Sequence, residues 1–470
     1  MESSQGSGSA VGTSVSDLIV ARLERLPYSG THRRILLILG AGTLLDHYDM
    51  LTLGSALAVA FQTFHISMAS TGVLLGFGFL GQFVGAITFG VLSELWGRKK
   101  AFILALLIMG VFCIASGLAW SFGSLVAFRA LAGIGLGGEF PIASAMMSEF
   151  VRARRRGRDV LVYQTVTSWA STIAPLAGFV FIHYLGGEAG WRLLLISGGL
   201  PILLAPVALG LLPESVRWLV KKGRHEQAEA TVAAFESYVT SKGIALEPVH
   251  VQAHADVKPT RFSELFHKDY RRRTSLLWVH WFFNQCITAA NIFWIPSLLT
   301  RVGHLKPTQS LGLMVVLNVI GLLFAYAVAI WFIEQLGRRT TFTIGWCGYL
   351  LGALFGLLSV TLFHAQSSWV VLFIAGTVIH MNIGICGQGT GLYAPELFPT
   401  RMRGFATSSG RAVALVAGTI SPMVVGWLFA SKLGITGYYG FLVVMAIVGL
   451  INFRVRGIET RGVMLEELSR

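Results

Sequence analysis

The chain has 470 residues, of which 54% are apolar and 13% are charged, and its mean hydropathy is +0.66. Soluble proteins carry about 25% charged residues, so this composition excludes an ordinary soluble domain and indicates many membrane-spanning segments. A formal net charge of +14 would suggest a nucleic-acid partner in a soluble chain. Here the basic residues fall between apolar runs, mostly on one side, and we assign them to membrane topology.

In chain order, a polar tail of residues 1–30 comes first, and its Ser- and Gly-rich start predicts disorder. Twelve apolar runs follow, each long enough to cross about 30 Å of hydrocarbon. They lie near residues 34–62, 70–93, 100–120, 122–148, 160–184, 191–212, 274–300, 308–333, 341–363, 368–394, 404–430 and 436–455. A polar segment, residues 213–272, separates the first six from the last six, and its stretch from Gly223 to Tyr238 has helical periodicity.

This order predicts an all-α membrane protein with twelve spans in two six-helix bundles, residues 31–212 and 273–457, followed by a tail of residues 458–470. Basic residues gather in alternate connections. They are Arg98, Lys99, Lys100, Arg152, Arg154, Arg155, Arg156, Arg158, Lys221, Lys222, Arg271, Arg272, Arg273, Arg338, Arg339, Arg401 and Arg403. By the positive-inside rule, we expect these connections, the central segment and both termini on the cytoplasmic side.

One short signature occurs twice, each time directly after an apolar run. Residues 94–99 read Glu-Leu-Trp-Gly-Arg-Lys, and residues 334–339 read Glu-Gln-Leu-Gly-Arg-Arg. A second pair repeats in step, because segments 149–157 and 396–404 both run from a Glu to a Gly eight residues later. The chain therefore reads as one membrane unit duplicated. Two related bundles are what an alternating-access carrier needs, with the substrate site at their interface near the midplane.

Five signatures, in this order, resemble those of the major facilitator superfamily of transporters. They are residues 94–99, Arg129 with Gly133, Gly135 and Gly137, Pro213-Glu214-Ser215 with Arg217-Trp218-Leu219, residues 334–339, and Pro395-Glu396 to Gly404. The resemblance covers nearly all of residues 30–460 and is strongest to the metabolite and aromatic-acid proton symporters and related organic-ion transporters. The loop acid of this family is usually Asp, whereas both copies here have Glu, which keeps the charge.

The resemblance also implies that the repeated signature is a gate latch that stabilises one access state. A carboxylate at the end of the second span can cap the N-terminus of a neighbouring helix and pair with Arg, while Gly97 and Gly337 permit a tight turn. The alternative is a mere topology anchor, and the duplication favours the latch. The residues assigned to the gating motif are Gly90, Glu94, Gly97, Arg98, Glu149, Arg158, Glu334, Gly337, Arg338, Glu396 and Arg403.

Charged residues inside the spans are the sharper clue, since they are costly in a membrane and usually serve function. Asp46 and Asp49 are three residues apart and share a helix face. Arg129 lies at a comparable depth, so we expect it to contact one of them, and the resemblance independently implies an Asp–Arg couple in proton-linked members. We assign Asp46, Asp49, Arg129 and Glu139 to proton coupling, with Asp46 ahead of Asp49. The alternatives are a static buried ion pair and, for Glu139, a place in a helix-packing seam.

Arg411 is the second cation within a span, and the resemblance to organic-anion transporters implies that it faces substrate. A guanidinium in a desolvated cavity binds a carboxylate with two hydrogen bonds; the alternative is a helix–helix pair with Glu396 or another acid. Aromatic faces with a few polar groups suit a planar ligand, although each such residue alone is more often a packing residue. The other residues assigned to substrate binding are Tyr48, Trp169, Trp281, Asn284, Gln285, His380, Asn382, Gln388 and Tyr393.

Residues 133–138 formally match Gly-x-Gly-x-x-Gly, but they lie inside a span with no strand before them, so we assign them to helix packing. The four cysteines lack metal spacing, and we expect no metal and no cofactor besides the coupling proton. We predict a secondary active transporter, not an enzyme, that carries a small organic anion with protons across a bacterial inner membrane. It is expected to act as a monomer among membrane lipids, with a small-molecule substrate and no nucleic acid. The alternatives are a sugar or organic-cation transporter of the same fold and a transporter-like receptor.

Overall fold

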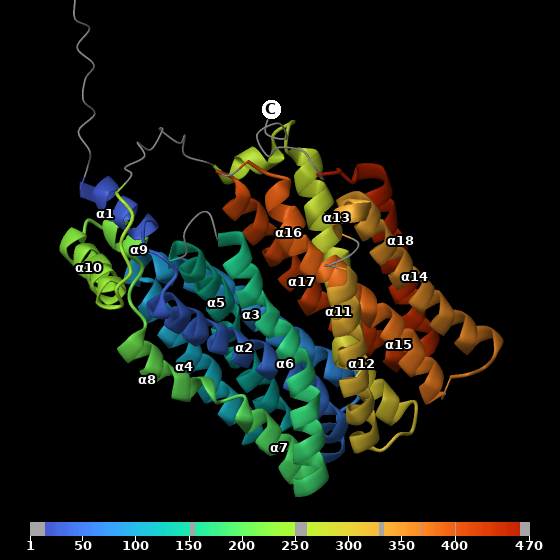
Figure 1. The fold of residues 1–470 in the computed structure, drawn as a ribbon. Coiled ribbons are helices and arrows are strands. Elements are labelled where there is room, and N and C mark those ends of the chain that lie inside the picture. Colours follow the sequence, from blue (N-terminus) through green and yellow to red (C-terminus); the bar gives the residue numbers. More distant parts are fainter. Residues whose placement is uncertain are drawn as a thin grey trace, which may run out of the picture.

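The computed structural model of the chain describes residues 15–150, 156–249, 261–328, 333–366, 368–399 and 401–460. Figure 1 shows two helical bundles side by side, the first coloured blue to green and the second yellow to red. The first bundle contains α2 (Gly30–Thr63), α3 (Met68–Trp96), α4 (Arg98–Gly117), α5 (Phe122–Phe150), α6 (Arg156–Leu185), α7 (Gly187–Ser197) and α8 (Pro201–Leu211). The second contains α11 (Arg271–Arg301), α12 (Pro307–Ala327), α13 (Ile333–Leu336), α14 (Arg338–Leu362), α15 (Trp369–Ile383), η3 (Gly384–Gln388), α16 (Gly389–Glu396), α17 (Arg403–Ala430) and α18 (Gly434–Arg456).

The predicted spans fold as helices. Within the described residues, eleven helical segments are long and apolar enough to cross a membrane. In two of them the helix changes along its length: α7 and α8 together form one segment, and α15, η3 and α16 form another. The remaining predicted span is α11, a helix of 31 residues whose composition is less apolar. Its buried polar side chains His280, Asn284 and Asn291 explain the difference, because they face protein rather than lipid.

A small helical group lies at one end of the first bundle. It contains α1 (Val15–Glu24), α9 (Val216–Lys221) and α10 (His225–Ser241), and α1 packs against both of the others. Arg22 and Arg25 both form ion pairs with Glu236 at 2.7 Å, and Arg217 pairs with Glu24. The expectation of a disordered tail through residue 30 is therefore wrong for Val15–Glu24, because this segment has an apolar face and charges that α10 complements.

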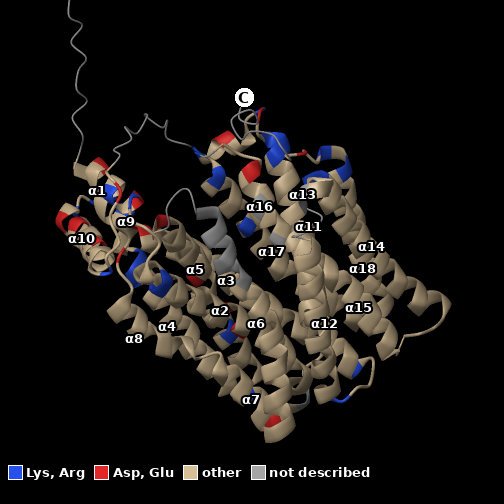
Figure 2. Cartoon of the chain, in the orientation of Figure 1, with Lys and Arg blue, Asp and Glu red and all other residues tan. Residues whose placement is uncertain are grey.

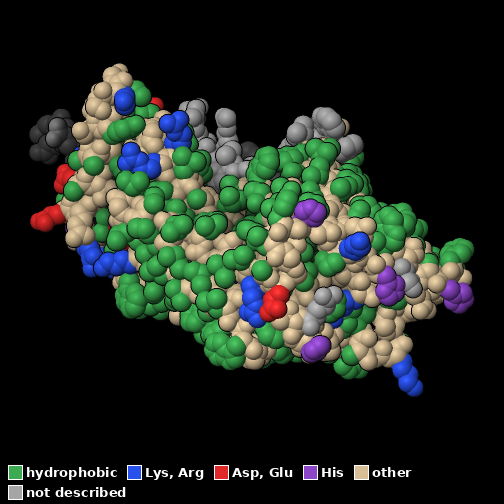
Figure 3. Space-filling view, turned by 90° about the horizontal axis from the view of Figure 1, so that it is seen from below, with side chains coloured by type: hydrophobic (Ala, Val, Ile, Leu, Met, Phe, Trp, Pro, Cys, Tyr) green, Lys and Arg blue, Asp and Glu red, His purple; other side chains and the backbone are tan. Residues whose placement is uncertain are grey.

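Charged residues divide the molecule into two unlike ends. One end, called the termini end below, carries α1, α9, α10 and the residues after α18. It bears most of the coloured charges in Figure 2. The opposite end, seen from below in Figure 3, is mostly apolar with few charged side chains. The described tight turns Gly97 and Gly337 both lie at the termini end, with φ of 107° and 78°, where a residue with a Cβ would be strained.

The two bundles touch through α3 with α17, α2 with α11, and α6 with α12. The α3–α17 seam is tight: a Cβ added at Gly72 would lie 2.3 Å from the carbonyl oxygen of Pro422. Phe79 and Phe293 meet edge-on across the bundles with ring centroids 5.6 Å apart, and the Arg301 guanidinium lies 4.0 Å from the Phe61 ring centroid. All these contacts lie toward the opposite end, so there the bundles are packed together.

Candidate functional site

The charged interior of the molecule belongs to the first bundle. Among the described residues, four Asp, Glu, Lys or Arg side chains are buried, and all four come from α2 and α5. They are Asp46, Asp49, Arg129 and Glu139. These are the residues assigned to proton coupling from the sequence. Burial of charge on this scale is costly unless the groups are paired, which makes their partners informative.

Asp49 and Arg129 form a bidentate ion pair between α2 and α5. Arg129 Nη1 donates to Asp49 Oδ1 at 3.0 Å, and Nη2 donates to Oδ2 at 2.8 Å. The sequence left open whether Asp46 or Asp49 contacts Arg129, and the structure places Asp49 there. Two parallel hydrogen bonds between ionised groups pair the two charges in this buried position.

Asp46 and Glu139 lie together without such a partner. One Asp46 oxygen lies 3.2 Å from His47 Nδ1, and the other has no hydrogen-bond partner among the described residues. Glu139, also fully buried, accepts a hydrogen bond from Thr43 Oγ1 at 3.1 Å. The two carboxyl groups interact electrostatically with each other. This arrangement differs from the Asp49–Arg129 pair, because among the described residues no guanidinium forms an ion pair with either carboxyl group.

Arg411 reaches this cluster from the second bundle. Its guanidinium lies 4.4 Å from the ring centroid of Phe140, the residue after Glu139, and its charge acts on both Asp46 and Glu139. The His47 ring lies 5.7 Å from the same Phe140 ring. The alternative partner considered for Arg411, Glu396, is instead bonded to Arg338 and Thr460. The cluster therefore joins the bundles at a cation, two acids and an aromatic face.

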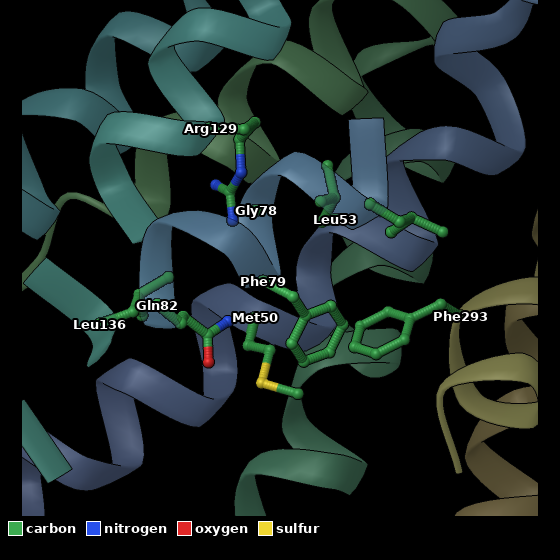
Figure 4. Close-up of a pocket in the computed structure, with 9 residues that line it drawn as sticks. Met50, Leu53, Gly78, Phe79, Gln82, Arg129, Leu136 and Phe293 are labelled. Carbon is green, nitrogen blue, oxygen red and sulfur yellow. The ribbon is translucent and has the colours of Figure 1, made fainter. Parts of the chain in front are cut away.

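A small cavity lies next to the ion pair. Figure 4 shows Arg129 and Gln82 on one side of it and Phe79 facing Phe293 on the other. Its volume is about 20 Å³, about the size that holds one water. Met50 and Phe293 bring both bundles to its wall. The buried pair thus lies close to the contact surface between the bundles.

Three of the predicted substrate residues, Trp281, Asn284 and Gln285, belong to α11. The Trp281 ring packs on Gly410, the residue before Arg411, where an added Cβ would lie 2.6 Å from Trp281 Cδ1. Asn284, one turn along α11, accepts a hydrogen bond from Tyr349 at 2.9 Å. Gln285 is half-buried. Trp281 is thus adjacent to Arg411, whereas Asn284 is held by α14.

The structure does not bring the remaining predicted substrate residues together. Tyr48 bonds to Ser197 at 2.6 Å, and Trp169 is 57% exposed. His380 packs on Gly321, and Asn382 donates to the carbonyl of Val378 in its own helix. Tyr393 donates to the carbonyl of Ile458 at the termini end, which argues against contact with substrate. The side chain of Gln388 lies outside the described residues.

His280 is a polar group that sequence reasoning missed. It is buried in α11, and its Nε2 lies 2.6 Å from Thr390 Oγ1 and 3.0 Å from the carbonyl oxygen of Cys386. Cys386 lies in η3, a π-helical turn that interrupts the regular hydrogen bonds of its span. The π-helical turn itself has no clear sequence pattern. A histidine within a predicted span was nevertheless a usable signal, because such a side chain needs a hydrogen-bond partner.

The first copy of the repeated signature forms an ion-pair network at the termini end. Arg98, at the start of α4, pairs across the Gly97 turn with Glu94 of α3 and, at 3.5 Å, with Glu149 of α5. Glu94 also pairs with Lys221 at 2.9 Å. Gly90 is exposed, and the side chain of Arg158 lies outside the described residues. The predicted pairing between the loop acid and Arg is therefore present.

The predicted helix cap comes from a different residue. Glu214, not Glu94, accepts hydrogen bonds from the backbone N–H groups of Arg98 and Lys99 at the start of α4, at 2.9 and 3.1 Å. Glu214 lies far along the chain in the Pro-Glu-Ser segment, so only the fold brings it to this helix. A carboxylate at this position complements the helix dipole.

The second copy repeats this arrangement. Glu459, just after α18, accepts from the backbone N–H groups of Arg338 and Arg339 at 2.8 and 3.1 Å. Arg338 pairs with Glu396 at 3.1 Å, as Arg98 does with Glu149. Arg403 donates to the carbonyl of Phe398 rather than to an acid, and the side chain of Glu334 lies outside the described residues.

Comparison with known proteins places the chain in a family. Residues 36–470 match the family described as Sugar (and other) transporter. The chain is 28% identical over 457 residues to the niacin transporter NiaP of Acinetobacter baylyi, covering 96% of this chain and 99% of that protein. It is also 28% identical over 425 residues to the 4-hydroxybenzoate transporter PcaK of Pseudomonas aeruginosa, covering 89% of this chain and 90% of that protein.

Solved structures give the same fold. A crystal structure of a D-xylose–proton symporter matches with a TM-score of 0.71 at 20% identity, covering 92% of this chain and 99% of that chain. A partially occluded inward-open structure of the xylose transporter XylE from E. coli matches with a TM-score of 0.70 at 19% identity, covering 93% of this chain and 100% of that chain. The all-helical fold of the major facilitator superfamily, expected from the five signatures, is confirmed. The chain belongs to the sugar and metabolite transporter family of this superfamily, and it is a secondary transporter of the membrane rather than an enzyme.

Proposed function

We propose that this transporter carries a small organic anion, with an aromatic carboxylate as the preferred class, together with protons. The observation that supports this most is Arg411, a cation of the second bundle that meets two buried acids of the first bundle beside Phe140. A guanidinium offers a carboxylate two hydrogen bonds, and Phe140 and Trp281 offer a planar body two aromatic faces. Relatives whose names specify niacin and 4-hydroxybenzoate support the same class of substrate.

In this proposal Asp46 and Glu139 carry the coupled proton. Both are buried, they interact with each other, and Arg411 acts on both. A substrate carboxylate that pairs with Arg411 removes the nearest positive charge available to these acids, which favours proton uptake by one of them. Release of substrate returns Arg411 and favours proton release. Asp49, already paired with Arg129, fixes α2 against α5 and responds after Asp46 and Glu139.

We further propose that the termini end faces the cytoplasm of a bacterial cell, in its inner membrane. The basic residues at the termini end support this orientation. With that orientation, the packed opposite end, including the Phe79–Phe293 and Arg301–Phe61 contacts, is the closed outer gate. The molecule is then in an inward-facing arrangement, and the two capped turns at Gly97 and Gly337 belong to the inner gate.

Uptake into proteoliposomes tests the proposal. Purified protein is reconstituted, and uptake of labelled nicotinate, 4-hydroxybenzoate, xylose and a quaternary amine is measured with and without an inward proton gradient. We expect uptake of one or both aromatic acids, stimulated by the gradient and lost when a protonophore removes it. Transport of xylose or the amine alone, or acid uptake that ignores the gradient, would contradict it.

A sugar is the second candidate substrate. Asn284 and Tyr349 form a neutral polar pair inside the second bundle, and uncharged hydrogen-bonding groups are what a sugar hydroxyl needs. The xylose arm of the same experiment distinguishes the two substrates. Saturable xylose uptake that survives replacement of Arg411 by Gln would favour the sugar.

A further inference from the structure

A groove opens on the membrane-facing side of the first bundle, at its termini end. It lies between α4, α8 and α9 and has a volume of about 360 Å³. The wall nearest the loops carries Lys99, Lys100 and Arg224, and the wall nearest the membrane carries Trp96, Ile103 and Leu209. In Figure 2 blue segments mark the start of α4 below α9. The transport site described above does not use this groove.

The three cations are available to a ligand. Glu214 is the acid in the lining, and its Oε1 already accepts from the backbone N–H groups of Arg98, Lys99 and Ser215. The nearby Glu94 is engaged by Arg98 and Lys221. Within the part of the chain that the structure describes, the Lys99, Lys100 and Arg224 side chains form no ion pair. Arg224 instead lies 5.3 Å from the Trp218 ring centroid.

The other wall continues into an apolar surface. On α8, Leu203 is 67% and Leu209 63% exposed, and on α4, Val111 is 51% exposed. Exposed residues of this size on two spanning helices face lipid. Trp96, 53% exposed, lies at the level where tryptophan prefers the membrane–water interface. The groove therefore combines cations at headgroup level with an apolar floor at acyl-chain level.

We propose that this groove is a binding site for an anionic phospholipid. The headgroup phosphate lies against Lys99, Lys100 and Arg224, and the acyl chains follow Ile103 and Leu209 along α4 and α8. Basic pockets at the ends of spanning helices recognise such headgroups through their charge. A soluble phosphate compound would satisfy the cations but would leave the apolar floor uncovered.

The site is specific to the first copy of the repeat. In the second copy, the residue at the position of Lys99 is Arg339, and its guanidinium donates to the carbonyl oxygen of Arg454 at 2.7 Å. The first-copy groove also touches the latch, since Trp218 donates from Nε1 to the carbonyl oxygen of Glu94 at 3.0 Å. A lipid bound here supports the capped start of α4, so anionic lipid is expected to stabilise this arrangement of the first bundle.

Native mass spectrometry of the full chain tests the assignment. The purified protein is titrated with phosphatidylglycerol, phosphatidylcholine and sn-glycerol 3-phosphate. We expect phosphatidylglycerol to bind most tightly and its affinity to fall about tenfold or more in the triple variant K99Q/K100Q/R224Q. The matched control K242Q/K268Q/R271Q removes the same charges from exposed positions of the termini end outside the groove, and it should bind as the parent does. The conservative variant K99R/K100R/R224K should retain binding.

Several outcomes would overturn the proposal. If the triple variant and its control lose affinity for phosphatidylglycerol equally, the binding depends on the overall surface charge and not on this groove. Binding of glycerol phosphate as tight as that of phosphatidylglycerol would assign the groove to a soluble phosphate. If the triple variant fails to fold, a photoactivatable phosphatidylglycerol bound to the unmodified protein decides. Crosslinks in α4 and α8 support the site, and crosslinks elsewhere refute it.

Discussion

The two bundles share a fold but differ in what they bury. The first encloses Asp46, Asp49, Arg129 and Glu139, while the described part of the second has no buried Asp, Glu, Lys or Arg. The second bundle instead holds neutral polar contacts such as Asn284 with Tyr349. Arg411 is a half-buried cation of the second bundle, and its charge acts on Asp46 and Glu139 of the first bundle. Under the proposed function, the charged bundle handles protons and the neutral bundle offers the cation that substrate needs.

The helix caps and ion pairs around the two copies of the repeated signature, in contrast, are alike in both bundles. Glu214 caps α4 as Glu459 caps α14, and Arg98 meets Glu149 as Arg338 meets Glu396. We therefore propose that the structure repeated between the bundles has a mechanical role and that the structure not repeated carries the chemistry of transport. The following changes test that division.

The largest effect is expected at the charged pair of the first bundle. Arg129→Ala leaves Asp49 buried with no cation, which should cost about 3–5 kcal/mol of stability. The free energy of unfolding, measured by titration with denaturant in mixed micelles, checks this. The double variant Asp49→Asn with Arg129→Met removes both charges and should recover most of the loss. A double variant no more stable than Arg129→Ala would contradict a tightly coupled pair.

A smaller effect is expected on substrate affinity at Arg411. Arg411→Gln removes a hydrogen-bonded charge worth about 1.5–3 kcal/mol, which corresponds to about 10- to 100-fold weaker binding of an aromatic acid. Isothermal titration or thermal-shift measurements with the acid check this. Arg456→Gln, at an exposed position at the end of α18, is the matched control and should bind normally. Undiminished binding by the Arg411 variant would remove it from the substrate site.

The two helix caps should have similar and more modest effects. Glu214→Ala and Glu459→Ala each remove hydrogen bonds to two backbone N–H groups at the start of the capped helix, and loss of a cap costs about 0.5–2 kcal/mol. Melting temperatures of both variants check this, with Glu226→Ala on the exposed face of α10 as control. A large drop in melting temperature for one cap variant and none for the other would contradict an equivalent role of the two copies.

The smallest effect is the pH response of the α1 contact, which has no counterpart in the second bundle. Burial alone would raise the pKa of Glu236, but hydrogen bonds from Arg22 and Arg25 outweigh it and hold the pKa below its ordinary value of 4.5. The stabilisation is therefore complete above pH 4.5 and is lost as the pH falls through the lower folded-state pKa. The protection factors for hydrogen exchange of Val15–Glu24, corrected for the intrinsic rate at each pH, should be high at pH 6 and lower in this acid range. Glu236→Gln should exchange fast at both pH values, and a variant that stays protected would refute the role of this carboxylate.

Local patterns predicted much of this molecule. Apolar runs predicted the helices, the duplicated loop located both tight turns, and the charges in the spans predicted a contact between Arg129 and either Asp46 or Asp49. The caps at Glu214 and Glu459 could not be predicted, because capping depends on where a distant segment lies in the fold. The docking of α1 was missed because its partner Glu236 lies in another segment. The aromatic and polar residues of the spans were poor predictors of the substrate site, because composition does not say which side of a helix faces a neighbour.

Proton movement measured during transport tests the central claim most directly. Proteoliposomes that contain a pH-sensitive dye report acidification when a transported acid is added outside. The account predicts acidification with the unmodified protein and none with Glu139→Gln or Asp46→Asn, while both variants still exchange labelled for unlabelled substrate. Glu188→Gln, a surface acid paired with Arg192 at the opposite end, should behave as the parent does. Acidification that persists in both buried-acid variants would contradict a proton-carrying role for the first bundle.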